Sequence, residues 1–429
     1  MKPSPVSTKS FGRTRLKALL VGVEFPGKPN SKPKGSLDEL TGLAETALYR
    51  PVASMVQKLG TINPKTFIGS GKVIELQQAV KHHQVDAVIF DEVLSPAQTR
   101  NLEKILECGV VDRAWIILEI FGDHARTRVA KTQVDLARLK YSLPRLTKMW
   151  THLSRQRGGI GMRDVGETQI QLDRRLLRDK ISKLEKKLKQ IHGEKQTQRK
   201  SRRGTFQVAL VGYTNAGKST LMNNLTGADT LVEDKLFATL DATVRKVKKN
   251  FPYPILLADT VGLIDKLPHD LVASFKSTLD EVRDANLLLH VVDISHPDFR
   301  SQMEIAENLI REIEAHAIDT VLVFNKTDKL KGEDTQKDLE RHYPEAVFVS
   351  CREGTGMGAL RKAIVENYEK TMIPYKVKLN YNQSGLIPEI RKHALVVKEN
   401  YEDNFLTLDL RVWPSHTAKL SQILNGRKP

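Results

Sequence analysis

The sequence predicts an α/β protein whose largest part is a mostly parallel sheet with helices on both faces. Near-continuous apolar runs alternate with helical patterns along the chain, which is typical of strands buried on both sides. A segment with the spacing GxxxxGKS, at 212–219, joins one apolar run to a helical pattern. Two segments whose apolar residues recur at helical spacing flank a glycine-rich segment at 157–167. We therefore expect a phosphate-loop (P-loop) domain, an N-terminal α/β domain, a helical hairpin and a small C-terminal α+β domain.

Length, charge and cysteine content narrow the class of protein. At 429 residues, with 40% hydrophobic and 28% charged residues, the chain should hold about two to four domains and should not be disordered or collagen-like. The formal net charge of +17 favours a polyanionic partner such as nucleic acid or an anionic membrane surface. Cys108 and Cys351 lack the spacing of a disulfide framework or a zinc site, which fits a reducing cytosol. With neither a signal-peptide core nor an apolar window that could span a bilayer, we expect a cytoplasmic protein without a membrane span.

The N-terminal α/β domain is expected over residues 15–120, after a flexible stretch at 1–14. The FIGSGK segment at 67–72 lacks the GxxxxGK spacing, so it predicts a turn before a helix and not a second phosphate loop. The N-terminus of that helix can still meet an RNA phosphate. Strand-like runs (KALLVGV, VDAVIFDE) alternate with helical patterns (SLDELTGLAETA, KVIELQQAVKHH, SPAQTRNLEKILE).

A helical hairpin is expected over residues 121–203. We expect Pro144 to kink its first helix and the segment 157–167 to form a loop without regular structure, exposed at the tip. The last part, GEKQTQRKSRRG, loses apolar periodicity and reads as a linker. The apolar residues that define the two helical faces are Val129, Leu136, Leu139, Leu143 and Leu146, and then Ile170, Leu177, Ile181, Leu184, Leu188 and Ile191.

Positive charge is concentrated in the second helix of this hairpin. Residues 174–203 carry 13 Lys or Arg against 3 Asp or Glu, a net charge of +10. Such a run is often only a solvated helix face. Here the excess of basic over acidic residues favours contact with RNA phosphates. No aromatic stripe interleaves it, so recognition of RNA shape and charge is expected instead of base readout. The candidate RNA-contact residues are Arg157, Gly158, Gly159, Gly161, Arg163, Arg174, Arg175 and Arg178.

The segment 204–368 carries the nucleotide chemistry. The strand pattern QVALVG leads into the loop 212–219 and then into the helical pattern TLMNNLTG. Its glycines let backbone N–H groups close on phosphate oxygens, Lys218 neutralises phosphate charge, and Ser219 offers an oxygen to magnesium. The candidate phosphate-binding residues are Gly212, Tyr213, Thr214, Asn215, Ala216, Gly217, Lys218 and Ser219.

Three further motifs follow at the ends of predicted strands. The first is expected at magnesium and the γ-phosphate, and the other two at the base. The DTVG motif at 259–262 can hold the magnesium shell through water and offer the Gly262 N–H to a γ-phosphate. In the NKTD motif at 325–328, the Asp328 carboxylate can accept two hydrogen bonds from the edge of guanine, a pair of donors that adenine lacks. These motifs predict a GTP-binding (G) domain. The candidate residues are Asp259, Thr260, Val261, Gly262, Asn325, Lys326, Thr327, Asp328, and Ser350, Cys351 and Arg352 as a backbone contact to the base.

The stretch FATLDAT is the only one placed to supply a switch threonine between the first two motifs. Thr239 is the preferred magnesium ligand besides Ser219, and Thr243 is the alternative. Lys218, Thr239 and Gly262 are the residues to which we assign catalytic roles. Nucleotide contacts are also expected from Phe237, Ala238, Leu240 and Asp241.

The C-terminal part, residues 369–429, reads as a small α+β domain. Its pieces KVKLNY, LIPEIRKHA, HALVVKENY and NFLTLDLRVWP suggest two antiparallel strands and a helix. No catalytic constellation is found there.

The chain as a whole resembles the HflX family of ribosome-associated bacterial GTPases, within the Obg and Era superfamily. Beyond the common GTPase motifs, the resemblance rests on SPAQTRNLE, RTRVAKTQVDLARLKYSLPRL, WTHLSRQ with GGIG, and GETQIQLDRR. It implies an N-terminal domain that binds the ribosome and a hairpin whose glycine-rich tip reaches toward the peptidyl-transferase region of the large subunit. It also implies a role in splitting stalled or hibernating ribosomes, notably after heat stress.

Three positions depart from the usual pattern of this family. Asp164-Val165 stands where the hairpin tip usually has Gly-Pro, which changes the geometry expected of that turn. The switch has Asp-Ala-Thr at 241–243 in place of Asp-Pro-Thr, and Ser350-Cys351 replaces Ser-Ala. Both of these keep the backbone roles of the nucleotide site.

Our leading hypothesis is a GTPase that uses its nucleotide state to control binding to the large ribosomal subunit. We expect it to be a monomer. Leu263 follows DTVG where Ras-like enzymes place a water-orienting glutamine, so intrinsic hydrolysis should be slow until docking orders the switch. Asn215 resembles the asparagine that binds potassium in related GTPases, so K⁺ is a candidate cofactor beside Mg²⁺. The alternatives are a nucleotide-gated RNA-binding or assembly factor with incidental hydrolysis, and an ATP-dependent RNA remodeller, against which Asp328 argues.

Overall fold

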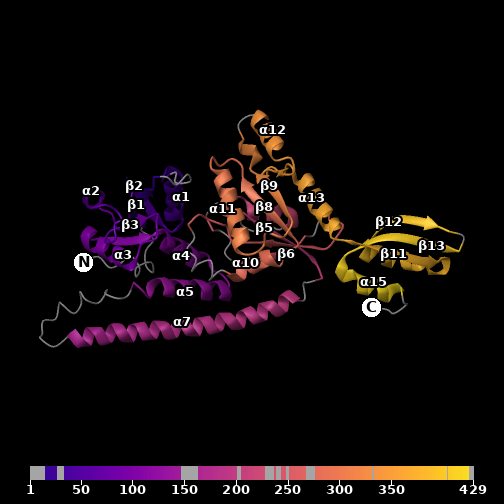
Figure 1. The fold of residues 1–429 in the computed structure, drawn as a ribbon, viewed down its shortest axis with the longest axis horizontal. Coiled ribbons are helices and arrows are strands. Elements are labelled where there is room, and N and C mark those ends of the chain that lie inside the picture. Colours follow the sequence, from indigo (N-terminus) through magenta and orange to yellow (C-terminus); the bar gives the residue numbers. More distant parts are fainter. Residues whose placement is uncertain are drawn as a thin grey trace.

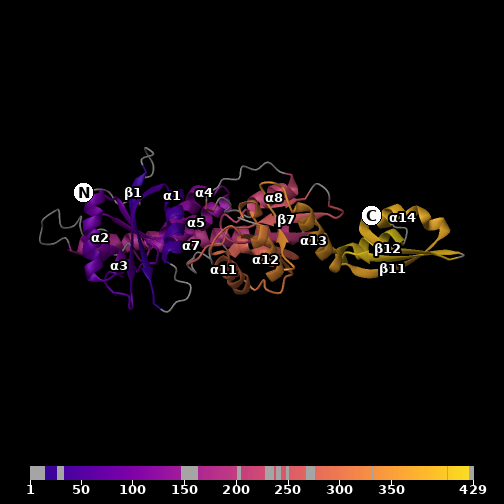
Figure 2. The same cartoon turned by 90° about the horizontal axis from the view of Figure 1, so that it is seen from above.

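The computed structural model describes residues 15–26, 33–145, 163–200, 204–227, 236–237, 243–247, 251–266, 276–330, 333–402 and 404–424. Three β-sheets follow one another along the long axis of the molecule, each with its own helices (Figures 1 and 2). A long helix runs beneath the first two sheets (Figure 1). Among the described residues, no helix is long and apolar enough to cross a membrane.

The N-terminal sheet has four parallel strands in the order β2-β1-β3-β4. Alternate residues of β1 enter opposite cores, Ala18 and Leu20 with α1 and α4, Leu19 and Val21 with α2 and α3. This confirms the expected α/β class. Helix α2 begins at Ser70, within the FIGSGK segment, of which only 67–69 precede the helix. The elements are β1 (Leu16–Glu24), α1 (Pro33–Thr46), β2 (Tyr49–Lys58), α2 (Ser70–His83), β3 (Ala87–Phe90), α3 (Pro96–Leu106), β4 (Gly109–Asp112) and α4 (Arg113–His124).

Helix α4 runs across the domain boundary that the sequence predicted between residues 120 and 121. Ile120 and Phe121 are both buried in the N-terminal core, so there is no break in burial at that point. The helix instead ends at His124, and α5 begins at Arg128. Thr127 caps α5, because its side chain accepts a hydrogen bond from the Ala130 N–H.

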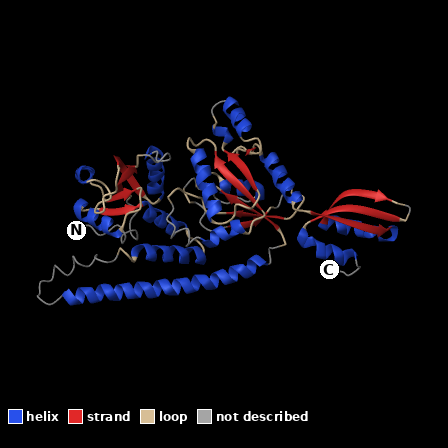
Figure 3. Ribbon diagram, in the orientation of Figure 1, coloured by secondary structure: helices blue, strands red, loops and turns tan. Residues whose placement is uncertain are grey.

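The hairpin consists of α5 (Arg128–Ser142) and α7 (Arg163–Lys200), which lie side by side and antiparallel (Figures 1 and 3). Lys140 of α5 pairs with Glu185 of α7 at 2.7 Å. The prediction of a kink at Pro144 was wrong, because the helix ends two residues earlier. Proline supplies no N–H to hydrogen-bond in a further helical turn, and its ring clashes with the backbone of the preceding turn.

Helix α7 is longer than the sequence predicted at both ends. It includes 163–167, expected as loop, and 193–200, expected as linker. No proline interrupts this stretch, and its Lys, Arg, Gln and Glu residues have good helix propensity. Gly166 and Gly193 each cost about 1 kcal/mol relative to alanine, which does not outweigh the rest.

The central sheet has the strand order β10-β9-β8-β5-β7-β6 and is parallel except for β6, which pairs antiparallel with β7. Helices α8 and α13 cover one face, while α10 and α11 cover the other. The short polar strand β6 was not predicted, because its TVRK sequence carries no apolar alternation. The elements are β5 (Phe206–Val211), α8 (Lys218–Thr226), β6 (Thr243–Lys246), β7 (Ile255–Asp259), α10 (Lys276–Arg283), β8 (Leu287–Asp293), α11 (Phe299–Glu312), β9 (Thr320–Asn325), η3 (Thr327–Lys329), α12 (Glu333–His342), β10 (Val347–Phe348) and α13 (Met357–Lys370).

The C-terminal sheet has three antiparallel strands in the order β11-β13-β12, not the two that the sequence predicted. The residues KVKLN form the second half of β11, which pairs with β13 along its whole length. Trp413, after β13, stacks on Tyr368 of α13 at a centroid distance of 5.2 Å and joins this sheet to the central one. The elements are β11 (Ile373–Asn380), η4 (Tyr381–Leu386), α14 (Ile387–His393), β12 (Ala394–Tyr401), β13 (Phe405–Val412), η5 (Pro414–His416) and α15 (Thr417–Leu424).

Candidate nucleotide site

The four predicted motifs meet at the carboxyl edge of the central sheet. The loop 212–217 follows β5, Asp259 ends β7, Asn325 ends β9, and Ser350 follows β10. Strand β5 lies between β8 and β7, where the strand order of the sheet changes direction. In open α/β sheets, ligands bind outside the carboxyl ends of the strands at such a point. The fold therefore brings together side chains that lie more than a hundred residues apart in the sequence.

Two glycines of the phosphate loop are required by its shape. Gly212 and Gly217 have φ values of 151° and 93°, which side-chain-bearing residues rarely adopt. A Cβ at Gly212 would lie 2.1 Å from the Val291 carbonyl oxygen, and one at Gly217 would lie 2.2 Å from Nδ2 of Asn325. The loop can close on a phosphate only because both positions lack a side chain.

Lys218 is buried at the start of α8, and its ammonium group curls back over the loop. Its Nζ donates to the carbonyl oxygens of Gly212 and Tyr213, at 2.9 and 2.7 Å. Burial lowers the pKa of Lys218 to about 8, and the Asp259 carboxylate opposes that shift. A buried ammonium that donates to two neutral carbonyls is well suited to pair with phosphate oxygens.

Ser219 and Asp259 form an oxygen-rich corner beside Lys218. The Ser219 Oγ donates to Oδ2 of Asp259 at 2.7 Å, and Asp259 is 2% exposed. A hydroxyl and a carboxylate are hard oxygen donors of the kind that Mg²⁺ prefers when nucleotide phosphates and water complete its shell. Among the described residues no group of three or more His, Cys, Asp or Glu could hold a metal ion.

The opposite end of the site is built around Asn325 and Asp328. The Ser350 Oγ donates to Oδ1 of Asp328 at 2.6 Å and so orients the carboxylate that we expect to face guanine. Asn325 is 1% exposed; its Nδ2 donates to the Ala216 carbonyl at 2.8 Å, and its Oδ1 accepts from the Cys351 N–H at 3.1 Å. Asn325 therefore braces the phosphate loop against the segment after β10, a role that sequence reasoning did not assign.

Further predicted residues lie around this core with distinct partners. The Thr260 hydroxyl donates to the Leu210 carbonyl at 2.5 Å, and the Lys326 ammonium pairs with Asp293 at 2.6 Å. Asn215 and Arg352 are exposed. Thr243, the alternative magnesium ligand, begins β6 directly opposite Asp259.

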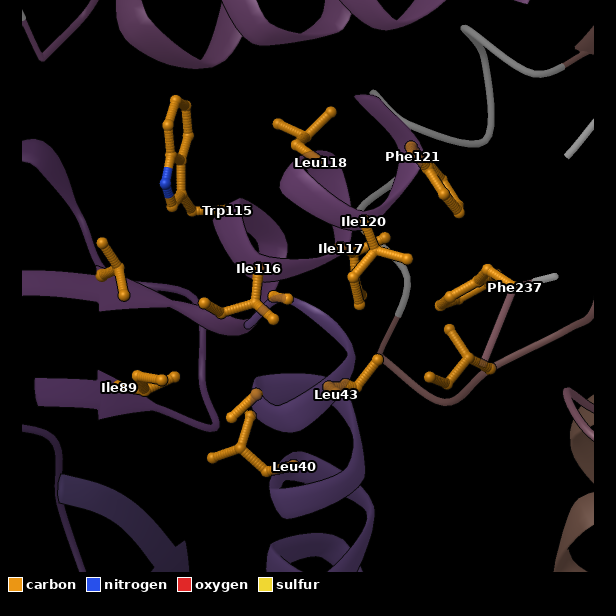
Figure 4. Close-up of a cluster of buried hydrophobic side chains, with 14 of the residues drawn as sticks. Leu40, Leu43, Ile89, Trp115, Ile116, Ile117, Leu118, Ile120, Phe121 and Phe237 are labelled. Carbon is orange, nitrogen blue, oxygen red and sulfur yellow. The ribbon is translucent and has the colours of Figure 1, made fainter. Parts of the chain in front are cut away.

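The side chain of Phe237 packs against helix α4. It is 2% exposed and contacts Phe121 of α4 edge to face, with ring centroids 4.7 Å apart, inside the N-terminal core (Figure 4). The expectation that Phe237 contacts the nucleotide stays a prediction. Burial against this apolar surface stabilises its aromatic ring.

Several predicted residues cannot be placed. Ala238, Thr239, Leu240 and Asp241, together with Arg157, Gly158, Gly159 and Gly161, lie outside the described residues. Arg163 begins α7, and of the other candidate RNA contacts on that helix Arg175 and Arg178 are exposed while Arg174 is half-buried.

Comparison with known proteins agrees with this geometry. Residues 34–122 match the family described as GTP-binding GTPase N-terminal, residues 124–202 the GTP-binding GTPase Middle Region, and residues 207–326 the 50S ribosome-binding GTPase family. A GTP-binding protein of Sulfolobus solfataricus solved with GDP is 25% identical, with a TM-score of 0.42 over 83% of this chain and 99% of that one.

Two curated relatives cover most of the chain. GTPase HflX of Flavobacterium psychrophilum is 45% identical over 384 residues, which is 84% of this chain and 92% of that protein. GTPase HflX of Escherichia coli is 40% identical over 399 residues, 92% of this chain and 93% of that protein. The chain binds guanine nucleotides and hydrolyses GTP, and it belongs to the HflX family of GTPases.

Proposed function

We propose that this GTPase acts on the large ribosomal subunit and separates stalled or hibernating ribosomes under stress. The observation that carries the proposal is the match of residues 207–326 to the 50S ribosome-binding GTPase family. The basic helix α7 supports it independently. Its exposed Arg175 and Arg178 lie in the segment with a net charge of +10, where phosphate contact is favoured over a solvated face.

The proposed chemistry follows from the site residues. The loop 212–217 and Lys218 hold the β- and γ-phosphates, and the Gly262 N–H meets the γ-phosphate. Ser219 and Thr239 would hold Mg²⁺, and Asp259 would hold it through water. When bound, Mg²⁺ neutralises charge that develops on the phosphate oxygens during transfer to water. Asp328 selects guanine.

The residue after DTVG supplies no catalytic side chain. Leu263 is 5% exposed, its N–H donates to the Gly212 carbonyl at 3.1 Å, and its carbonyl accepts from the Thr214 N–H at 2.7 Å. An aliphatic side chain cannot orient the attacking water. We therefore propose that intrinsic hydrolysis is slow, and that docking on the subunit orders the switch around Thr239.

Isolated large ribosomal subunits are expected to raise the rate of GTP hydrolysis by roughly 10-fold or more, because docking completes the positioning of the reacting groups. The measurement is phosphate release by the purified protein, alone and with subunits, at the same salt and Mg²⁺ concentrations. Joint replacement of Arg175 and Arg178 by alanine should reduce the stimulation but not the intrinsic rate. Arg283→Ala, an exposed arginine of α10, is the matched control.

Binding without stimulation would reject this mechanism and favour a nucleotide-gated RNA-binding or assembly factor. The exposed, basic face of α7 is the feature that keeps this second function in consideration. Ser219→Ala separates the two. If subunit splitting survives when hydrolysis is lost and GTP binding is kept, hydrolysis is incidental.

We also propose that K⁺ assists hydrolysis through Asn215. This residue is exposed in the phosphate loop and adopts a φ of 59°, a conformation that asparagine tolerates better than most residues. A potassium ion there would supply positive charge that the site otherwise lacks. Hydrolysis should be several-fold faster in KCl than in NaCl at equal ionic strength, about threefold or more, and Asn215→Ala should abolish the difference. Equal rates in the two salts would refute the proposal.

A further inference from the structure

A network of buried charges joins the N-terminal unit, β1 to α4, to the segment after Gly262. The Lys266 ammonium contacts Oδ2 of Asp91 at 2.5 Å and Oε1 of Glu92 at 2.7 Å, both just after β3. It also donates to the Ser36 hydroxyl of α1 at 3.2 Å. Only three residues separate this lysine from Gly262, the glycine that we expect at the γ-phosphate.

The network continues into the interior of the N-terminal unit. The Arg113 guanidinium, with its side chain 1% exposed, donates to Asp91 at 2.9 Å and to Glu39. Burial opposes ionisation of Asp91, but the charges of Arg113 and Lys266 outweigh it and hold the pKa of this carboxyl below its usual value. Two cations thus compensate three carboxylates, and removal of either cation leaves buried negative charge unpaired.

Tyr213 connects the same network to the phosphate loop. Its hydroxyl donates to Oε1 of Glu39 at 2.5 Å and accepts from the Asp265 N–H at 2.9 Å. Leu263 is paired with Gly212 and Thr214 of the loop. The segment 263–266 is therefore held from both sides, by the phosphate loop and by the N-terminal unit.

The backbone of Lys266 is strained in this arrangement. Its φ of 55° lies in the left-handed region, which lysine rarely adopts. Such conformations persist where surrounding contacts hold them, and they concentrate in segments that switch. Val261 and Ile264 of the same stretch are buried in the N-terminal core, so any movement of it also disturbs apolar packing.

We propose that Lys266 and Tyr213 are positioning residues through which the N-terminal unit senses the γ-phosphate. When the Gly262 N–H moves toward a γ-phosphate, the residues 263–266 move with it. Lys266 then loses its contacts with Asp91 and Glu92. The contacts of the network thus favour the GDP-bound state. Because coupling between two sites is reciprocal, GTP loosens the contact with the N-terminal unit by the same factor. This inference rests on GTP hydrolysis and not on ribosome binding.

The test uses the full-length protein with GDP or with a non-hydrolysable GTP analogue. In Lys266→Gln, the affinity for the analogue relative to GDP should rise by roughly fivefold or more. Hydrogen exchange of 87–93 and 36–46 in the unmodified protein should be slower with GDP than with the analogue, and the variant should lose that difference. Lys58→Gln, which removes an exposed lysine paired with Glu24 on the same unit, should change neither readout.

Glu92→Gln provides a second variant that avoids the buried core. The side chain of Glu92 is 25% exposed, so Glu92→Gln removes a charge at the edge of the network and keeps both cations of the buried Asp91. The double exchange Lys266→Glu with Glu92→Lys should partly restore the affinity ratio. If either single variant changes exchange equally in both nucleotide states and leaves the affinity ratio within about twofold, the network is only structural and the proposal is wrong.

Discussion

Asp328→Asn is expected to weaken GTP binding by roughly 100-fold or more, because one carboxylate is proposed to accept two N–H groups of guanine. The asparagine amide has one carbonyl oxygen and one NH₂ group, so one of the two guanine N–H groups would face another donor instead of an acceptor. The same change should improve binding of xanthosine triphosphate, whose base has a carbonyl where guanine has an amino group. Fluorescence titration with labelled GTP and XTP measures both affinities.

The structure limits the change to the base end of the site. Ser350 holds Oδ1 of Asp328, while Lys218 and Ser219 lie at the phosphate end. Hydrolysis at saturating nucleotide should therefore fall much less than affinity. Asp338→Asn, on an exposed aspartate of α12, is the control. An unchanged preference for GTP over XTP would show that Asp328 does not read the base.

Lys218→Met is expected to reduce GTP hydrolysis by about 100-fold or more, since a buried cation aimed at the phosphates is lost. Methionine retains most of the apolar stem and adds no buried charge, so the variant should fold with equal or greater stability. Phosphate release and thermal unfolding measure the two effects. Lys362→Met, on an exposed lysine of α13, controls for loss of positive charge.

The pH dependence gives a second readout of Lys218. Because burial lowers its pKa to about 8, the nucleotide-free protein loses this charge above that pH and GTP affinity should fall. Stability should move the other way. Between about pH 8 and 10.5 the unfolded chain binds more protons than the folded one, so this lysine makes stability rise with pH. In Lys218→Met both contributions should disappear; persistence of the fall in affinity would assign it to another group.

Local patterns were sufficient to predict much of the fold. Apolar runs predicted β5, β7, β8 and β9 because each is a short stretch buried on both faces, and the GxxxxGKS spacing predicted the loop between β5 and α8. Strand β6 and the third C-terminal strand were missed. The TVRK sequence of β6 carries little apolar alternation, and pairing with other strands decides the conformation of both segments.

The sequence by itself determined the fold class, the order of the nucleotide motifs and the family resemblance, because each depends on residues close together in the chain. Only the tertiary structure decided that Phe237 packs against Phe121, that Asn325 braces the phosphate loop, and that Lys266 reaches Asp91. Tyr213 and Glu39 are 174 residues apart, and neither is unusual in its local pattern. Such contacts join elements that lie far apart in the chain, and no local periodicity records which of their surfaces will face each other.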